Sequence, residues 1–360
     1  MNSNRTYIIA EAGVNHNGSI SMAKELVFRA AEAGADAVKF QTFKAKNIIT
    51  NHAEKADYQK KTTNSQETQL EMVQKLELTL EMHEELLGYC KELNIEFLST
   101  PFDLDSVDLL TQHIKVDKLK MSSGEITNAP LLLKAAQSGL PVILSTGMSL
   151  LGEIEEALGV LAFGYVQSGT APSFQAFEEA YTSIEGQQAL QNKVTLLHCT
   201  TEYPAPLTEV NLKAMDTMFA AFGLPVGFSD HTEGISIPIA AVARGAKVIE
   251  KHFTLDKNLP GPDHKASIEP DELKQMIESI RQVEEALGTK IKKMTQSEQK
   301  NKHIARKSLV AACGIRKGET FTPNNLTSKR PATGISPMYY WDIIGKQADR
   351  DYQADEVIQL

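Results

Sequence analysis

Cysteine is scarce in this chain of 360 residues, and its three cysteines, Cys90, Cys199 and Cys313, lie far apart. Three dispersed thiols form neither a disulfide framework nor a zinc cluster, so we expect them to be reduced, as in a cytoplasmic protein. No apolar run approaches the roughly 18 residues that a membrane-spanning helix needs. The N-terminus leads into a strand-like segment at residues 7–10 without the apolar stretch of a signal peptide. We therefore expect a cytoplasmic protein with no membrane association.

An excess of positive charge is also absent. The chain has 37 Lys and Arg residues against 46 Asp and Glu residues, a net charge of -9 at pH 7. This balance argues against a surface that coats nucleic acid, and no nucleic-acid partner is expected. An anionic substrate stays possible, because a few local lysines decide whether an anion binds. A content of 42% hydrophobic and 23% charged residues is typical of a globular enzyme.

Short apolar runs alternate with amphipathic stretches along most of the chain, which is the pattern of parallel β/α units. The predicted strands are residues 7–11, 37–42, 96–100, 118–122, 142–146, 194–199, 226–230 and 247–253. The predicted helices are residues 22–33, 81–93, 129–138, 151–162, 211–222, 235–244 and 272–287. Eight strands with crossover helices predict a (β/α)8 TIM barrel. The alternative is a six-stranded doubly wound sheet, but no glycine-rich dinucleotide turn follows the first strand.

The composition changes after the last predicted helix. Residues 289–303 are rich in Lys, Gln, Ser and Thr with little apolar content, which predicts an exposed linker of random coil. Residues 304–360 contain short strand-like and turn-like segments and are too few to carry a reaction alone. We therefore predict an α/β barrel domain over residues 1–288, a linker over 289–303 and a small β-rich domain over 304–360.

Two predicted strands end in histidine, at His231 and His252. Neighbouring parallel strands bring such side chains to one edge of the sheet, where they form a metal site or an acid/base pair. A histidine at a strand end can also simply pack or hydrogen-bond. Two histidines without a cysteine cluster argue against a closed zinc site. Mn²⁺, Mg²⁺ or Co²⁺ with water and substrate oxygens fits better and would polarise a carbonyl group.

Lys39 and Lys120 lie within otherwise apolar strands. An unpaired buried ammonium costs several kcal/mol, so each lysine must pair with a carboxylate such as Glu11 or Glu125, or bind an anion. Hydroxyl groups lie near the ends of four different predicted strands or in the turns after them, at Thr100, Ser123, Ser145 and Ser229. Two ammonium groups among hydroxyl donors suit a phosphate together with a carboxylate. Glu125, between Lys120 and the turn at Gly124, is the first candidate for moving protons, and Glu11 is the second.

At these positions the chain resembles the sialic acid synthases. The matching segments include Ala-Glu-Ala-Gly-Val-Asn-His-Asn-Gly at 10–18, Val-Lys-Phe-Gln-Thr at 38–42, Ser-Thr-Pro-Phe at 99–102, Ser-Asp-His-Thr at 229–232 and Glu-Lys-His-Phe at 250–253. Beyond the predicted linker, residues 315–319, 325–326 and 329–331 resemble the small antifreeze-like (SAF) domain that ends these synthases. The resemblance covers nearly the whole chain with its motifs in a fixed order. It implies a TIM barrel followed by a SAF domain.

The resemblance also implies an activity and a role for each candidate residue. The family condenses phosphoenolpyruvate with an N-acetylmannosamine-type sugar, giving a nine-carbon 2-keto acid, here N-acetylneuraminate, and phosphate. The implied phosphoenolpyruvate ligands are Lys39, Thr100, Lys120, Ser123, Ser145 and Ser229. The implied metal ligands are His231 and His252, with Mn²⁺ most expected, the catalytic carboxylate is Glu125, and the sugar ligands are Tyr203, Asp263 and Arg330. Family members are domain-swapped homodimers, so Arg330 would reach the partner's barrel.

Two features bear on how far the resemblance carries over. Residues 58–61, Tyr-Gln-Lys-Lys, also resemble family members that act on legionaminic-acid precursors, so an N,N'-diacetyllegionaminate synthase acting on 2,4-diacetamido-2,4,6-trideoxymannose is the alternative. The connection over residues 161–192 is longer than is usual in the family. Another aldolase-type barrel that condenses phosphoenolpyruvate would not explain the C-terminal domain. A non-enzymatic binding protein would not need the buried charges.

Overall fold

The computed structural model describes residues 5–50, 68–166 and 169–359. Residues 58–61, which carry the likeness to legionaminic-acid enzymes, lie outside these ranges. The chain forms two compact units, one over residues 1–288 and one over residues 289–360. None of the helices in the described ranges is long and apolar enough to cross a membrane.

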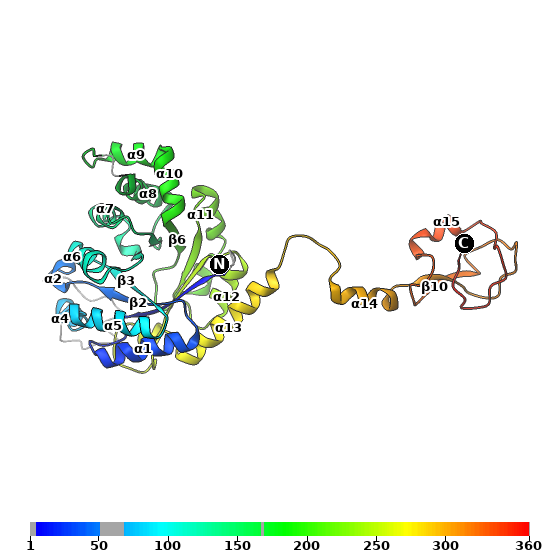
Figure 1. Ribbon diagram of the computed structural model, residues 1–360, viewed down its shortest axis with the longest axis horizontal. Coiled ribbons are helices and arrows are strands. Elements are labelled where there is room, and N and C mark those ends of the chain that lie inside the picture. The colour runs from blue at the N-terminus through cyan, green and yellow to red at the C-terminus, as the bar shows by residue number, and fades with distance from the viewer. Residues whose placement is uncertain (1–4, 51–67, 167–168, 360) are drawn as a thin grey trace. The chain divides into compact units, whose positions relative to one another are not determined.

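The first unit is an eight-stranded parallel barrel, which confirms the predicted TIM barrel (Figure 1). Its strands are β1 (Tyr7–Gly13), β2 (Ala37–Thr42), β3 (Glu96–Pro101), β4 (Leu119–Met121), β5 (Val142–Ser145), β6 (Val194–His198), β7 (Val226–Asp230) and β8 (Val248–His252). Hydrogen-bonded neighbours follow the order β3-β2-β1-β8-β7-β6-β5-β4, and each pair is parallel. The two end strands, β3 and β4, lie in contact and close the barrel.

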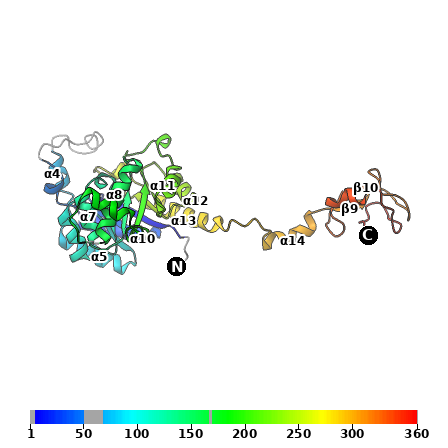
Figure 2. The same cartoon turned by 90° about the horizontal axis from the view of Figure 1, so that it is seen from above.

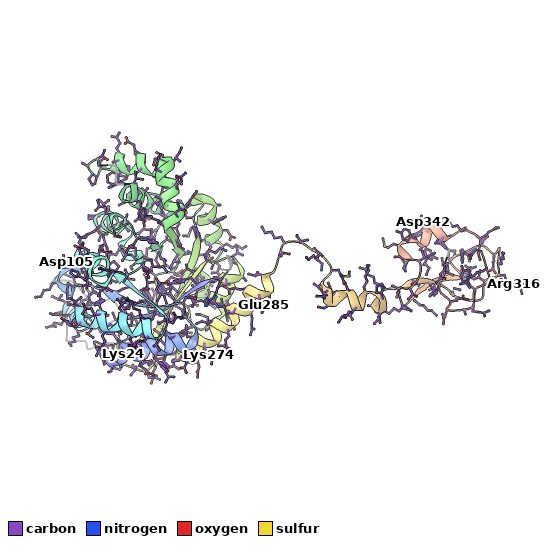
Figure 3. All side chains as sticks on the ribbon, viewed as in Figure 1. Lys24, Asp105, Lys274, Glu285, Arg316 and Asp342 are labelled. Carbon is purple, nitrogen blue, oxygen red and sulfur yellow. The ribbon has the colours of Figure 1, made fainter. Side chains whose placement is uncertain are left out.

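Helices cover the outside of the barrel in both views (Figure 2). They are α1 (Ile20–Ala33), α2 (Ala45–Ile48), α4 (Gln69–Gln74), α5 (Leu80–Glu92), α6 (Leu104–Asp108), α7 (Ala129–Gln137), α8 (Leu151–Val166), α9 (Phe174–Thr182), α10 (Ile184–Lys193), α11 (Ala214–Phe222), α12 (Ser236–Ala243) and α13 (Pro270–Leu287). The helix α13 shows why these segments pack as they do. Its apolar stripe, with Leu273 and Ile280, is buried, whereas Lys274 and Glu285 are exposed on the opposite face (Figure 3).

The long connection over residues 161–192 holds helical structure that the sequence pattern did not predict. The helix α8 continues to Val166, and α9 and α10 follow it. Ser173 and Ser183 each cap a helix by accepting a hydrogen bond from a backbone N–H of its first turn. The helices α9 and α10 are short and bury only Ala180, Gly186 and Leu190, so few apolar positions mark them in the sequence and the caps define their starts.

The second unit contains the helix α14 (Gln296–Ala305), the strands β9 (Ser308–Ala311) and β10 (Leu326–Lys329), and the short helix α15 (Tyr340–Ile343). The expectation of random coil throughout the linker was therefore wrong over α14. Thr295 and Glu298 form a capping box at the start of α14, and the polar residues that follow form helices well without burial.

The strands β9 and β10 pair antiparallel beside a small apolar core that includes Leu309, Phe321 and Tyr352. Beside these two strands, isolated bridges join Val310 to Val357 and Ile315 to Tyr352. The second unit is therefore a small domain held by turns and one apolar cluster.

Candidate active site

Alternation along the strands divides the barrel interior into two layers. Ile9, Ala37, Leu98, Ile143, Leu197 and Val248 form an apolar cluster at the lower level. Two residues further along the same strands come Glu11, Lys39, Thr100, Ser145 and Glu250. Because side chains two residues apart in a strand point to the same face, the second layer is polar and lies toward the carboxyl ends of the strands.

A cavity of about 400 Å³ opens above this polar layer. It brings together most of the residues predicted from the sequence: Glu11, Lys39, Thr100, Lys120, Ser123, Ser145, Tyr203, Ser229, His231, His252 and Asp263. Glu125 does not line the cavity, and Arg330 belongs to the second unit. The carboxyl ends of the strands thus gather side chains that are up to about 250 positions apart in the chain.

The centre of the polar layer is a cluster of two lysines and two glutamates. The Lys39 ammonium pairs with the Glu11 carboxylate and lies 3.5 Å from a carboxylate oxygen of Glu250. Lys120 Nζ lies 3.2 Å from the other oxygen of Glu250. All four side chains are at least nine-tenths buried, so their charges interact strongly and must balance one another.

The two carboxylates differ in acidity. Burial raises the pKa of Glu11 to about 7, although the Lys39 ammonium acts in the opposite direction. Burial also acts to raise the pKa of Glu250, but the ammonium groups of Lys120 and Lys39 outweigh it and hold that pKa well below its ordinary value. Burial opposes the charge on Lys39, but the two carboxylates raise its pKa. Glu250 therefore stays ionised near neutral pH, while Glu11 can gain or lose a proton there.

Glu250 is a site residue that the sequence analysis did not assign. Strand alternation could have found it, because Glu250 lies two residues before His252 on β8 and so faces the same cavity. Ser229 on the neighbouring strand donates a hydrogen bond of 2.8 Å to its Oε1. The predicted partners of the lysines were Glu11 and Glu125. The described partners are Glu11 and Glu250.

The hydroxyl groups surround this cluster. Lys39 donates to Thr100 Oγ1 at 3.1 Å, and the backbone N–H of Gly147 donates to Ser123 Oγ at 2.9 Å. Ser145 Oγ is buried and has no hydrogen-bond partner among the described residues. A buried hydroxyl without a partner costs about 1–3 kcal/mol, so its position beside the lysines suits a bound polar ligand.

The rings of His231 and His252 have their centroids 5.5 Å apart. His231 Nδ1 donates to the backbone oxygen of Thr200 at 2.6 Å, which orients the ring. His252 Nδ1 is buried without a hydrogen-bond partner in the described part of the chain. Burial lowers the pKa of both imidazoles, so both are neutral at pH 7, the form that binds metals.

The donor set at this position consists of two imidazoles. Within the described ranges, no group of three or more His, Cys, Asp or Glu side chains is placed to hold a metal ion. The pair, with an oriented ring and an unsatisfied buried nitrogen, fits a divalent ion that takes its remaining ligands from water or substrate.

Tyr203 and Asp263, the two sugar ligands expected in the barrel, both line the cavity. The Tyr203 ring lies over His231 with a centroid distance of 4.2 Å and meets His252 at 90°. Burial raises the pKa of Asp263 to about 6. Tyr203 therefore lies beside the histidines, and Asp263 is a buried carboxylate in the wall of the same cavity.

Glu125 and Arg330 occupy other surroundings. Glu125 ends the short turn 123–125, and its carboxylate accepts a hydrogen bond of 2.7 Å from the Asn128 side chain, the residue that caps α7. Its neighbour Ser123 faces the cavity instead. Arg330 belongs to the second unit, where its Nε donates to the backbone oxygen of Ala305 at 2.8 Å. Their assigned roles stay predictions.

Comparison with known proteins identifies the family. Residues 26–292 match the NeuB family and residues 306–360 match the SAF domain. An N,N'-diacetyllegionaminic acid synthase of Campylobacter jejuni subsp. jejuni serotype O:2 is 57% identical over 99% of both chains. A protein of the same name from Legionella pneumophila is 45% identical over 97% of this chain and 92% of that one. The N-acetylneuraminic acid synthetase of Leptospira borgpetersenii, crystallised with citrate, is 33% identical, with a TM-score of 0.68 over 83% of this chain and 90% of that one.

These matches confirm the resemblance drawn from the motifs, the SAF domain and the expectation of an enzyme rather than a binding scaffold. Among the products expected from the sequence, they favour legionaminate over N-acetylneuraminate. The chain belongs to the NeuB family and carries a C-terminal SAF domain.

Proposed function

We propose that this chain is an N,N'-diacetyllegionaminate synthase. It condenses phosphoenolpyruvate with 2,4-diacetamido-2,4,6-trideoxymannose and releases phosphate. The observation that carries the proposal is the 57% identity, over 99% of both chains, to the Campylobacter jejuni protein of that name. The legionaminate alternative thus replaces N-acetylneuraminate as the preferred product.

Lys39 and Lys120 bind phosphoenolpyruvate in this proposal. Their ammonium groups line the cavity together with hydroxyl groups that can donate to phosphate or carboxylate oxygens. Ser145 Oγ has no hydrogen-bond partner among the described residues, so it is available to the substrate. Glu250 pairs with both lysines and positions them before the substrate arrives. When phosphate leaves, the same ammonium groups stabilise its growing negative charge.

The reaction joins C3 of phosphoenolpyruvate to the aldehyde carbon of the open-chain sugar. C2 becomes electron-deficient and takes up a water molecule, which loses one proton. The aldehyde oxygen takes up a proton as the C–C bond forms. The resulting tetrahedral carbon expels phosphate by cleavage of its C–O bond, and the proton of its hydroxyl group leaves with the phosphate, which gives the 2-keto acid. The step therefore needs a group that accepts a proton and is close to C2.

Glu11 is suited to that proton transfer. Its pKa of about 7 lets it accept a proton at neutral pH, and Lys39 beside it stabilises the ionised form. Glu125, the first candidate from the sequence, lies outside the cavity and accepts from Asn128. We therefore assign the proton transfer to Glu11.

His231 and His252 would hold the divalent ion, with Mn²⁺ most expected. When bound, the ion supplies Lewis acidity to the sugar aldehyde. Thr200 keeps the His231 ring in place through the Nδ1 hydrogen bond. Tyr203, stacked on that ring, limits how the sugar can approach, and Asp263 accepts hydrogen bonds from sugar hydroxyls once it is ionised.

The second substrate site is completed by a second copy of the chain. The SAF domain is a separate unit joined to the barrel through residues 289–303, and an exposed arginine on it, Arg330, can hold an acyl group. The resemblance to domain-swapped homodimers supports transfer of this domain to the partner's barrel.

Incubation with phosphoenolpyruvate, Mn²⁺ and the diacetamido sugar tests the proposed function. Mass spectrometry should detect N,N'-diacetyllegionaminate and equimolar phosphate. Product formed from N-acetylmannosamine but not from the diacetamido sugar would refute the proposal.

A further inference from the structure

One side of the cavity is apolar, in contrast to the polar layer beneath it. Its residues come from the ends of β2 and β3 and from the helices α2 and α4. They are Phe43, Ile48, Met72, Val73, Leu76 and Phe102, here named the apolar wall. Nothing in the chemistry of phosphoenolpyruvate requires such a surface, because that substrate is charged at both ends.

The apolar wall is a packed structure. The rings of Phe43 and Phe102 meet edge to face, 6.3 Å apart and at 77°. Phe43 and Leu76 are buried and form a small core of their own, against which Ile48, Val73 and Phe102 pack. Ile48 and Val73 are only half-buried. Ile48 and Val73 are therefore held by the small core beneath them, and their methyl groups line the cavity.

The position of the apolar wall relates it to the sugar. In the cyclic order of the strands, β2 and β3 lie opposite β6 and β7. His231 follows β7, and Tyr203 lies in the connection between β6 and β7, so the histidine side and the apolar wall face each other across the cavity. A sugar whose aldehyde carbon is near His231 and His252 can extend its far end across the cavity to the wall.

The wall discriminates between sugars by what their far ends carry. A hydroxyl group buried there without a hydrogen bond costs about 1–3 kcal/mol, whereas a methyl group gains from burial. Two amides, Gln41 and Gln69, also line the cavity and can serve a neighbouring polar group. The surface thus fits a sugar end that combines a methyl group with an amide.

We propose that the apolar wall is the subsite for the C6 methyl group of a 6-deoxy sugar, with Ile48 and Val73 as its specificity-determining residues. The proposal rests on the proposed function, in which the substrate lacks the 6-hydroxyl group. It adds that selection against the 6-hydroxyl group is made by α2 and α4.

The test compares N-acetylmannosamine with its 6-deoxy analogue, which differ by a single hydroxyl group. The chain should have a kcat/KM about 10-fold higher for the 6-deoxy sugar. Val73→Thr and Ile48→Thr place a hydroxyl on the wall and should each reduce that preference several-fold, with the KM for phosphoenolpyruvate unchanged. Val283→Thr is the matched control, because Val283 is also half-buried but lies on α13 outside the cavity.

Two results would overturn the inference. One is that the unsubstituted chain does not prefer the 6-deoxy sugar, and the other is that Val73→Thr and Ile48→Thr prefer it as strongly as the unsubstituted chain does. An unchanged KM for phosphoenolpyruvate shows that the substituted barrel is folded. Kinetics with the diacetamido sugar separate this inference from the proposed function. If that sugar is a poorer substrate than N-acetylmannosamine while the 6-deoxy preference and its loss in Val73→Thr persist, the proposed function fails and the subsite stands.

Discussion

The ammonium group of Lys39 pairs with the carboxylate of Glu11 across neighbouring strands of the barrel, and both side chains are almost fully buried. The pair shares the polar layer with Lys120 and Glu250, so two positive groups face two carboxylates of unequal acidity. When Glu11 takes up a proton, the cluster gains a net positive charge. This relationship connects the binding of an anionic substrate to the movement of a proton.

Replacement of Glu11 should therefore affect turnover more than binding. Glu11→Gln keeps the shape of the side chain but removes its ability to accept a proton, so kcat should fall by about 10² or more. Binding of phosphoenolpyruvate, measured by calorimetry, should persist, because both lysines remain. Glu125→Gln is the matched comparison, since Glu125 lies outside the cavity and bonds to Asn128. A larger loss of kcat in Glu125→Gln than in Glu11→Gln would return the proton transfer to Glu125.

Activity should depend on a divalent ion bound by the two histidines. Chelation should abolish turnover and Mn²⁺ should restore it. Removal of one imidazole leaves a single protein ligand of the donor set, so His231→Ala and His252→Ala should each weaken Mn²⁺ binding at least about 10-fold, as measured by electron paramagnetic resonance. Full activity in excess chelator, or unchanged Mn²⁺ affinity in both variants, would contradict the assignment.

Much of this site follows from the sequence because strand alternation and strand ends decide which side chains enter a barrel. Lys39 and Lys120 stood out as charges in apolar strands, and His231 and His252 as histidines at strand ends. Glu250 follows the same alternation, but the sequence analysis considered only His252 in the segment 250–253 and missed the glutamate. The role of Glu125 was inferred from its position in the sequence. In the structure, the turn Ser123–Glu125 directs the Glu125 carboxylate to Asn128.

Other features depend on contacts that a sequence pattern does not carry. The apolar wall combines residues from two short helices and two strand ends, and none of these segments is periodic enough to mark a shared surface. The helices α9, α10 and α14 begin at capping residues and bury few side chains, so their polar sequences were interpreted as loop or linker. Tertiary packing thus forms the apolar wall, and local caps define where the three helices begin.

Stability should fall as the pH drops below 6.5. Burial lowers the pKa of His16 and of His264 to about 4, so both are neutral in the folded chain and become protonated on unfolding below pH 6.5. Their contribution is present above pH 6.5 and is lost as the pH falls toward 4. The free energy of unfolding in urea should decrease by about 1–3 kcal/mol per histidine over this range. His16→Asn should flatten the dependence, whereas the control His113→Asn, at an exposed position, should not. Parallel curves for the parent chain and His16→Asn would refute the prediction.

The SAF domain should act on the barrel of a partner subunit. Arg330→Ala should chiefly raise the KM for the sugar, because the resemblance assigns Arg330 to the acyl group of the sugar and the lysines of the barrel to phosphoenolpyruvate. An equal mixture of Arg330→Ala and Glu11→Gln chains should regain activity after subunit exchange. Statistical pairing leaves about a quarter of the sites with both residues intact if the domain acts in trans. Activity no higher than that of either variant alone, with exchange verified by mass spectrometry, would show that the domain acts in cis.

The choice of sugar is the most direct test of the proposed synthase. With saturating phosphoenolpyruvate and Mn²⁺, phosphate release should be measured against 2,4-diacetamido-2,4,6-trideoxymannose and N-acetylmannosamine. We expect a kcat/KM at least about 10²-fold higher for the diacetamido sugar. The apolar wall contributes about 10-fold through the 6-methyl group, and the second acetamido group adds polar contacts, for which Gln41 and Gln69 line the cavity. An equal or higher kcat/KM for N-acetylmannosamine would contradict the assignment as a legionaminate synthase.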